Sequence, residues 1–146
     1  MSHATRALFA YGTLQVPEIL EALCGRALRG RPARLEGFGR GRIRDEVYPA
    51  VAPRAGARTV GQLYLDLRDA DLAALDAFEG EIYDRRSLAV TPLDESPAVV
   101  AWVYVLVPEA APLLCDEPWD LATFERAHAP GYVRRCRALR AQLGGR

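Results

Sequence analysis

The chain has 146 residues, of which 50% are hydrophobic and 26% charged. This length predicts one domain spanning residues 1–146, with roughly two-thirds of its unfolded surface buried. The formal net charge is zero, which excludes a global attraction to nucleic acid or to an anionic membrane. Every basic residue is arginine, so Schiff-base and lysine-nucleophile chemistry are excluded as well.

The cysteines and the termini bear on the cellular compartment. Cys24, Cys115 and Cys136 are odd in number and show no C-x-x-C spacing, which predicts free thiols in a reducing compartment. The first residues lack the apolar core of a signal peptide, and no apolar run approaches the ~20 residues of a membrane span. We therefore expect a soluble, cytoplasmic protein with neither a nucleic-acid nor a membrane partner.

Residues 8–14 predict a strand that runs into a tight turn. Leu8, Phe9 and Ala10 suit a strand, and Gly12 allows both a sharp turn and the close approach of a ligand to the main chain. A strand that ends this way leaves backbone N–H groups facing whatever lies beyond it. The pattern fits a purely structural turn as well as a binding loop.

The next segments predict a helix followed by irregular strands. Residues 16–23 have Pro17 in the first turn of a predicted helix and Gly25 just beyond its end. Residues 26–44 alternate basic and apolar side chains between glycines, which indicates one or two irregular strands. Residues 48–51 are expected to form a short extended segment that leads into the next strand.

Residues 59–67 predict a clearer strand, because apolar and polar side chains alternate along it. The alternation places three leucines on one face and a more polar set on the other. These sets are Leu63, Leu65 and Leu67, and Gln62, Tyr64 and Asp66.

A second helix is expected after this strand, and further strands and helices complete the chain. Asp69 or Asp71 would cap the helix, which runs to residue 78 or 79 and ends at Gly80. Strands are predicted over 87–93 and over 99–107; the second is apolar on both faces and should be covered on both sides.

Beyond Pro118 the chain is expected to be helical, in two pieces parted by residues 129–131. The elements do not alternate regularly between strand and helix along the chain. Their order therefore favours an α+β fold over a doubly wound sheet.

Several common catalytic machineries are missing from the sequence. The only histidines are His3 and His128, and the serines lack motif context, which argues against a Ser-His-Asp triad. A pair of Cys115 with His128 is conceivable, but an unsupported cysteine is more often a small buried hydrophobe. His128 is expected to be a helix-surface or packing residue. No metal-ligand spacing, G-x-G-x-x-G fingerprint or Walker loop is present.

One carboxylate is predicted on the buried, apolar side of its helix. Leu72, Leu75 and Phe78 form the inward-facing stripe, and Glu79 follows four residues after Leu75 on that same side. Partial burial and the helix dipole in the last turn both raise the pKa of this carboxyl group. A glutamate in such surroundings is a candidate general base or acid.

A structural interpretation of Glu79 remains open beside this one. The side chain could reach solvent where the helix frays at Gly80, or it could pair with Arg85 or Arg86. Glu81 is a rival candidate, but it lies beyond the helix end and is expected to be solvated.

The motifs together resemble the γ-glutamylcyclotransferase-like family, and the last segment is similar to its avirulence-induced-gene-like branch. The likeness extends over nearly the whole chain. It is carried by Tyr11-Gly12-Thr13-Leu14, Tyr48-Pro49, Gly61-x-Leu63-Tyr64, Phe78-Glu79-Gly80, Tyr83-x-Arg85, Trp119-Asp120-Leu121, Phe124, His128 and Tyr132.

The resemblance implies a small, mixed, closed or nearly closed β-barrel with flanking helices. It also implies cyclisation of a γ-glutamyl group to 5-oxoproline, with release of an amine or amino acid and without a cofactor or metal. By this resemblance Glu79 is the catalytic residue, and Tyr11, Gly12, Thr13 and Leu14 bind the substrate.

Aromatic residues of the predicted barrel are candidates for the pocket walls, unless they simply belong to the core. They are Tyr83, Tyr104, Tyr64 and Trp102.

The implied reaction needs no nucleophile from the protein, which agrees with the lack of a catalytic nucleophile in the sequence. The attacking group is the substrate's own α-amine, so no serine, cysteine or lysine is required. That amine has a pKa of ~8 and must lose a proton before it attacks, a task suited to a glutamate with a raised pKa. The expected partner is a small γ-glutamyl compound. Two alternatives remain: a non-catalytic module that binds a metabolite or protein, and a tailoring enzyme that removes a γ-glutamyl protecting group.

Overall fold

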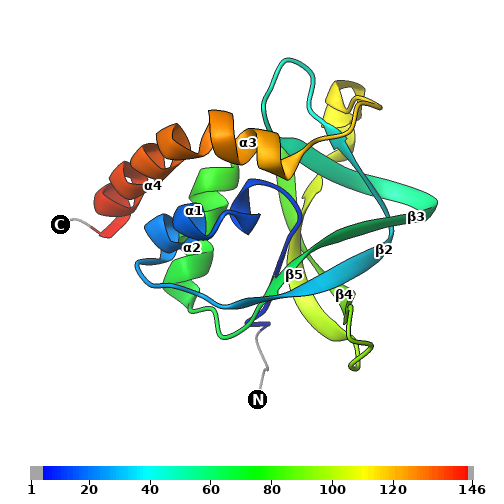
Figure 1. The fold of residues 1–146 in the computed structure, drawn as a ribbon, viewed down its shortest axis with the longest axis horizontal. Helices are drawn as coiled ribbons and strands as arrows, with labels where there is room; N and C mark the ends of the chain where they lie inside the picture. Colours follow the sequence, from blue (N-terminus) through cyan, green and yellow to red (C-terminus); the bar gives the residue numbers. More distant parts are fainter. Residues whose placement is uncertain (1–4, 145–146) are drawn as a thin grey trace.

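The computed structural model describes residues 5–144 and has five strands closed into a barrel, with helices gathered on one side (Figure 1). The order around the barrel is β1-β3-β2-β4-β5. Strand β1 runs antiparallel to β3 and parallel to β5, and the other neighbours are antiparallel. The expected α+β barrel with flanking helices is therefore confirmed. The strands are β1 (Leu8–Ala10), β2 (Gly30–Arg42), β3 (Pro49–Tyr64), β4 (Tyr83–Pro92) and β5 (Val99–Leu106).

The helices pack against one another as well as against the barrel. Helix α1 contacts both α2 and α4, and α3 leads directly into α4. No helix within residues 5–144 has the length and apolar composition needed to cross a membrane. The helices are α1 (Pro17–Cys24), α2 (Asp69–Glu79), α3 (Leu121–Ala127) and α4 (Ala129–Gly144), with short 3-10 helices η1 (Thr13–Gln15) and η2 (Pro108–Leu113).

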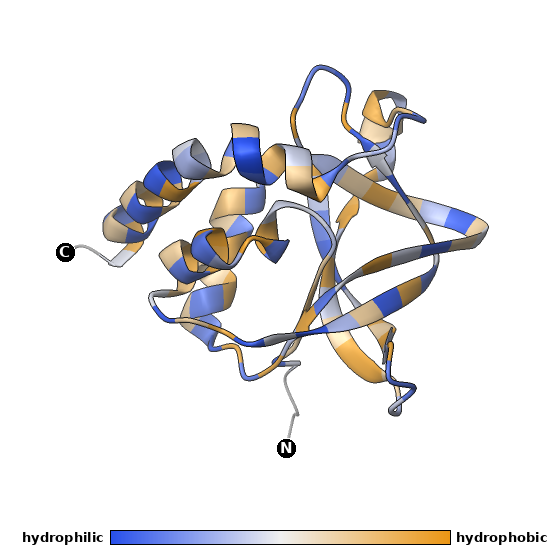
Figure 2. Cartoon of the chain, in the orientation of Figure 1, coloured by the Kyte–Doolittle hydropathy of each residue, from blue (hydrophilic) through white to orange (hydrophobic). Residues whose placement is uncertain are grey.

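Alternation along the strands divides the apolar side chains into two cores. In β1, Phe9 points into the barrel, whereas Leu8 and Ala10 pack beneath the helices. In β5, Val103 lies inside the barrel and Tyr104 lies on the helix side. The predicted cover on both faces is thus confirmed for residues 103–106, whereas Val100 near the start of β5 is exposed. Figure 2 shows hydrophobic residues along the barrel wall and hydrophilic ones at the hairpin tips.

The barrel closes tightly where β1 meets β3. A Cβ atom at Gly61 would lie 2.2 Å from the carbonyl oxygen of Ala10, so only glycine allows this approach. Strand β3 is one strand of 16 residues that begins at Pro49, so the extended segment expected over 48–51 is its start. Strand β2 is likewise continuous, with an irregularity between Glu36 and Phe38.

The predicted faces of residues 59–67 are wrong at the end of the strand. Strand β3 stops at Tyr64, and Leu65 is exposed, whereas Leu63 and Leu67 are buried. The reason is local: pairing in β3 ends at Tyr64, so Leu65 lies beyond the strand, and the positive φ of 64° at Asp66 redirects the residues that follow. Leu67 then returns to the core below the helices.

The helix boundaries also differ from expectation at two points. Helix α2 begins at Asp69 with Arg68 in the capping position, and the Asp71 carboxylate accepts a hydrogen bond from the Arg68 N–H at 2.8 Å. The break before α4 lies at His128, one residue before the predicted 129–131. Pro130 is tolerated in the first turn of α4 because no N–H is needed there.

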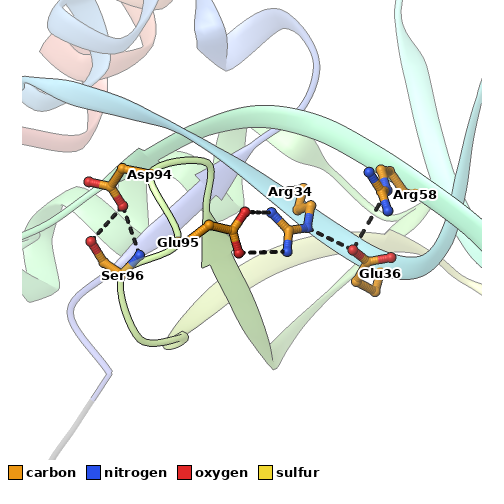
Figure 3. A network of polar contacts seen from close by, with 6 residues as sticks. All are labelled: Arg34, Glu36, Arg58, Asp94, Glu95 and Ser96. Atoms are coloured by element: carbon orange, nitrogen blue, oxygen red, sulfur yellow. Dashed lines mark hydrogen bonds and ion pairs between the residues drawn. The ribbon is translucent and has the colours of Figure 1, made fainter.

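The outer face of the barrel carries a network of ion pairs (Figure 3). The Arg34 guanidinium of β2 contacts Glu36 at 2.8 Å and Glu95 at 2.9 Å. Arg58 of β3 lies 3.6 Å from Glu36. Both carboxylates are exposed, so the network links neighbouring elements through solvent-screened contacts.

Candidate functional site

A cavity of about 260 Å³ lies between the barrel and the helices. Its floor comes from the end of β1 and the turn that follows. Its walls come from the end of α2 and from aromatic residues of the barrel, and α4 supplies the rim. The lining residues are Phe9, Ala10, Tyr11, Gly12, Thr13, Leu14, Tyr48, Pro49, Ala77, Phe78, Glu79, Tyr83, Tyr104, Tyr132, Arg135 and Leu139.

The turn after β1 is shaped by a contact with β3. A Cβ atom at Gly12 would lie 2.8 Å from Cγ of Pro49, so glycine lets the two segments meet. Helix η1 then begins, and the N–H groups of Thr13 and Leu14 have no acceptor inside it because they are its first residues. The predicted loop residues therefore place main-chain donors at the cavity.

Two tyrosine hydroxyls fix the wall beside this turn. Tyr11 donates a hydrogen bond to the carbonyl oxygen of Tyr104 at 2.5 Å, and Tyr83 donates to that of Pro49 at 2.7 Å. Burial raises the pKa of Tyr11, Tyr83 and Tyr104, so these side chains stay neutral hydrogen-bond donors. The predicted lining residues Tyr83 and Tyr104 both border the cavity.

Glu79 is the last residue of α2 and borders the cavity directly. The helix ends there because Gly80 adopts a positive φ of 82°. Within residues 5–144, no side-chain hydrogen bond or ion pair involves the Glu79 carboxyl group. Burial, and secondarily the charge of Asp76, raise its pKa from an ordinary 4.5 to about 8.

Asp76 lies one turn before Glu79 and is fully engaged. Its carboxylate accepts a hydrogen bond from the Tyr104 hydroxyl at 2.7 Å and pairs with the Arg85 guanidinium at 2.8 Å. The same guanidinium lies over the Trp102 ring, 4.2 Å from its centroid. The structural alternative in which Arg85 neutralises Glu79 is therefore wrong.

The alternative partner Arg86 and the rival carboxylate Glu81 can also be placed. Arg86 lies over the Phe38 ring, 5.8 Å from its centroid, and forms no ion pair with Glu79 within residues 5–144. Glu81 is exposed beyond the helix end, as expected.

Two aromatic candidates for the pocket walls do not border the cavity. Tyr64 is buried under the helices next to Gly30. Trp102 donates its indole N–H to the Thr5 carbonyl at 3.0 Å and supports Arg85. Both belong to the helix-facing side of the barrel, but they lie away from the turn after β1.

The cysteines and His128 do not form a catalytic pair. The Cys115 thiol lies 3.9 Å from the Leu113 carbonyl oxygen, and the His128 ring packs beside Phe124 at 5.9 Å. Burial raises the pKa of the Cys24 thiol to about 12 and that of Cys136 to about 11. Over the described range 5–144, no three His, Cys, Asp or Glu side chains converge as metal ligands.

Some cavity residues were not predicted as site residues. Tyr48, Pro49 and Tyr132 belong to the motifs that carried the resemblance, which was an available signal. Arg135 carries no comparable signal, because an arginine on a terminal helix is usually solvated. Asp76 was missed as well, although its position one turn before Glu79 on the same helix was an available signal; only its partners Tyr104 and Arg85 lie far along the chain.

The family described as "Gamma-glutamyl cyclotransferase, AIG2-like" matches residues 8–121, which is most of the chain. The chain belongs to this family. The predicted avirulence-induced-gene-like branch is confirmed, because AIG2-like protein C of Arabidopsis thaliana is 32% identical over 126 residues, 86% of this chain and 73% of the relative.

Solved structures of relatives share the fold. A protein of Arabidopsis thaliana studied in solution gives a TM-score of 0.70 at 25% identity, over 99% of this chain and 87% of its own. A mouse AIG2-like protein gives a TM-score of 0.61 at 28% identity, over 81% of this chain and 90% of its own. The AIG2-like family and its barrel are thereby shown for this chain.

Proposed function

We propose that this AIG2-like protein is a γ-glutamyl cyclotransferase, which converts a small γ-glutamyl amide to 5-oxoproline and a free amine or amino acid. The observation that carries the proposal is the Glu79 carboxyl group, which borders the cavity without a charged partner. The Glu79 side chain is half-buried, and an acid whose charged form is disfavoured by burial at a cavity is a functional-site candidate. Membership of the family supports the same reaction class.

Glu79 acts as a proton shuttle in this proposal. The carboxylate takes a proton from the substrate's α-ammonium group, and the freed amine attacks the γ-carbonyl carbon. A ring C–N bond forms, the proton held by Glu79 passes to the amide nitrogen, and the original amide C–N bond breaks. The ring nitrogen loses its second proton to the Glu79 carboxylate to become the neutral lactam, and this proton passes to the released amine. The pKa of Glu79, about 8, is close to the ~8 of an α-amine, so the first transfer costs little free energy.

The turn after β1 would hold the substrate while the ring closes. Free N–H groups at Thr13 and Leu14 can donate hydrogen bonds to either the substrate carboxylate or the oxyanion of the tetrahedral intermediate. Tyrosine hydroxyls and the Phe78 ring enclose the flexible glutamyl chain on the other sides. Holding this chain in a ring-closing conformation lowers the entropic part of the barrier.

The experiment measures 5-oxoproline released from a panel of γ-glutamyl amides by wild type and by Glu79→Gln. We expect the substitution to lower kcat by ~10²–10⁴-fold, because the amide cannot carry the proton. Glu81→Gln is the matched control, since Glu81 is the nearby exposed glutamate and should leave kcat unchanged.

Equal turnover by wild type and Glu79→Gln would exclude Glu79 as the proton shuttle. Binding of the amides by wild type without any 5-oxoproline release would favour the non-catalytic module instead. Release of 5-oxoproline only from a larger γ-glutamyl product would favour the tailoring alternative.

A further inference from the structure

The rim of the cavity is formed by α4, which lies beyond the residues 8–121 that the family match covers. Tyr132 and Arg135, one turn apart on this helix, both border the cavity. The rim therefore lies in a part of the chain that the family match does not cover.

Arg135 is held in place at this rim by an aromatic stack. Its guanidinium lies over the Tyr132 ring, 4.2 Å from the centroid. Tyr132 is itself held edge-on by Phe124 at 4.9 Å and by Phe78 at 6.2 Å between ring centroids. The guanidinium is thus positioned beside the cavity opening by a ring that is packed into the core.

Arg135 also brings the one positive charge among the residues that line the cavity. By contrast, the ion-paired arginines Arg26 and Arg85 each have a carboxylate within 3 Å. Across residues 5–144, no Asp or Glu side chain lies within ion-pair distance of Arg135. A guanidinium that is oriented by Tyr132 and has no carboxylate partner within these residues is suited to an anionic group of the ligand.

The proposed orientation of the substrate in the cavity follows from which of the lining residues are buried and which are exposed. The turn at residues 11–14 is buried at the floor of the cavity, whereas Arg135 is exposed at the rim. With the glutamyl chain on the floor beside Glu79, the group on the other side of the scissile amide extends toward α4. Arg135 therefore faces the leaving group.

We infer that Arg135 binds a carboxylate on the leaving group, so the preferred substrates are γ-glutamyl amino acids or peptides with a free carboxylate, ahead of neutral γ-glutamylamines. This inference rests on the proposed cyclotransferase function and adds the substrate class and the residue that selects it. A free carboxylate adjacent to the scissile nitrogen distinguishes the two classes of compound.

The test uses two substrates that differ in one group. In γ-glutamyl-isopropylamine, a methyl group replaces the carboxylate of γ-glutamyl-alanine. For the alanine compound, Arg135→Gln should lower kcat/KM about five- to tenfold, mainly through KM, because a charged contact at a partly exposed site is lost. For the isopropylamine compound, kcat/KM should change less than twofold. Arg134→Gln is the matched control, since Arg134 is the adjacent arginine of α4 and lines a different groove, against α1.

Binding is measured in parallel by calorimetry in the Glu79→Gln background, with and without Arg135→Gln. The dissociation constant should weaken five- to tenfold for γ-glutamyl-alanine alone, and the loss should shrink at 0.5 M salt. Equal weakening for both compounds would overturn the inference, because Arg135 would then hold the glutamyl carboxylate or the helix itself. No effect on either compound, or no binding of either, would overturn it as well.

The two proposals fail in different ways. If wild type binds both compounds and releases no 5-oxoproline, the cyclotransferase reaction fails while the ratio of dissociation constants still decides the role of Arg135. If 5-oxoproline is released and the two substrates respond equally to Arg135→Gln, only the substrate class fails.

Discussion

Two glutamates of this protein, Glu79 in the cavity and Glu95 on the outer face of the barrel, have opposite surroundings. Glu95 is exposed and receives hydrogen bonds from the Arg34 guanidinium, which lower the pKa of its carboxyl group (Figure 3). Glu79 borders an aromatic cavity, has no positively charged partner within residues 5–144, and has a pKa raised to about 8 by burial and by Asp76. The same side-chain chemistry is thus shifted in opposite directions by position in the fold.

This difference in pKa locates an energetically unfavourable carboxyl group at the cavity. The exposed carboxylates of Glu36 and Glu95 on the barrel are paired with arginines, and such pairs contribute little to stability because solvent screens them. The cavity instead retains an acid that would be more stable with a partner. This contrast makes Glu79 the group whose removal should change function most and should also relieve a cost in stability.

The largest effect is expected from Glu79→Gln on the pH dependence of stability. Between about pH 4.5 and 8 the folded protein keeps the Glu79 proton, whereas the unfolded chain releases it. The free energy of unfolding therefore falls as the pH rises through this window, by at most ~1.4 kcal/mol per pH unit. Glu79→Gln should remove this slope, so the variant should be more stable than wild type at pH 8 and similar to it at pH 4.

Chemical denaturation at pH 4, 6 and 8 measures this slope. Glu81→Gln, which changes a nearby exposed glutamate, should keep the wild-type slope. A Glu79→Gln variant that is less stable than wild type at pH 8 would mean that the carboxylate has a stabilising partner after all.

A smaller effect is expected from Asp76→Asn, which changes the neighbour of Glu79. Loss of the Asp76 charge removes one cause of the raised pKa and frees the Arg85 guanidinium, so the pKa of Glu79 should fall. The rising limb of kcat/KM should move to lower pH, and stability should fall by about 1 kcal/mol as the partly exposed pair is lost. A pH–rate profile together with thermal unfolding measures both changes.

Asp69→Asn is the control for this prediction, because Asp69 lies at the opposite end of α2 and pairs with Arg6 on the surface. It should leave the pH–rate profile in place. An unchanged profile in Asp76→Asn would show that burial alone sets the pKa of Glu79.

The smallest effect is expected from Glu95→Gln on the outer face. Because Arg34 lowers the pKa of Glu95, its contribution is present above the ordinary value of 4.5 and is lost as the pH falls below it. The group is solvent-exposed, so at neutral pH the thermal midpoint should change within measurement error, and turnover should be unchanged. A change in midpoint as large as that of Asp76→Asn would remove the distinction between the two regions.

The sequence predicted well what local geometry decides. Gly25 and Gly80 end helices with positive φ angles of 79° and 82°, as their positions suggested. The helical period placed Glu79 on the side of Leu75, and the helix does present Glu79 to the cavity. These features depend on neighbours within one or two turns, so a pattern in the sequence is enough to find them.

The local sequence pattern did not predict features that depend on the end of a strand or on a partner far along the chain. Strand β3 ended at Tyr64, which left Leu65 exposed, and the positive φ of Asp66 then redirected the chain so that Leu67 is buried. The choice of Asp76 over Glu79 as the partner of Arg85 depended on how β4 and β5 pack against α2. Neither outcome has a periodic signal, because each depends on backbone strain or on contacts between elements.

The sequence alone was enough to predict the strand and turn at residues 8–14 and the α2 helix with Glu79 in its last turn. It was also enough to predict the family, whose motifs include both segments. Only the tertiary structure decided that Glu79 is left unpaired in a cavity while Asp76 takes the available arginine, and that Arg135 of α4 stands at the rim. The physical reason is that the pKa of a carboxyl group depends on burial and on charges a few ångströms away. Those surroundings come from segments that are far apart in the chain and meet only when the barrel closes.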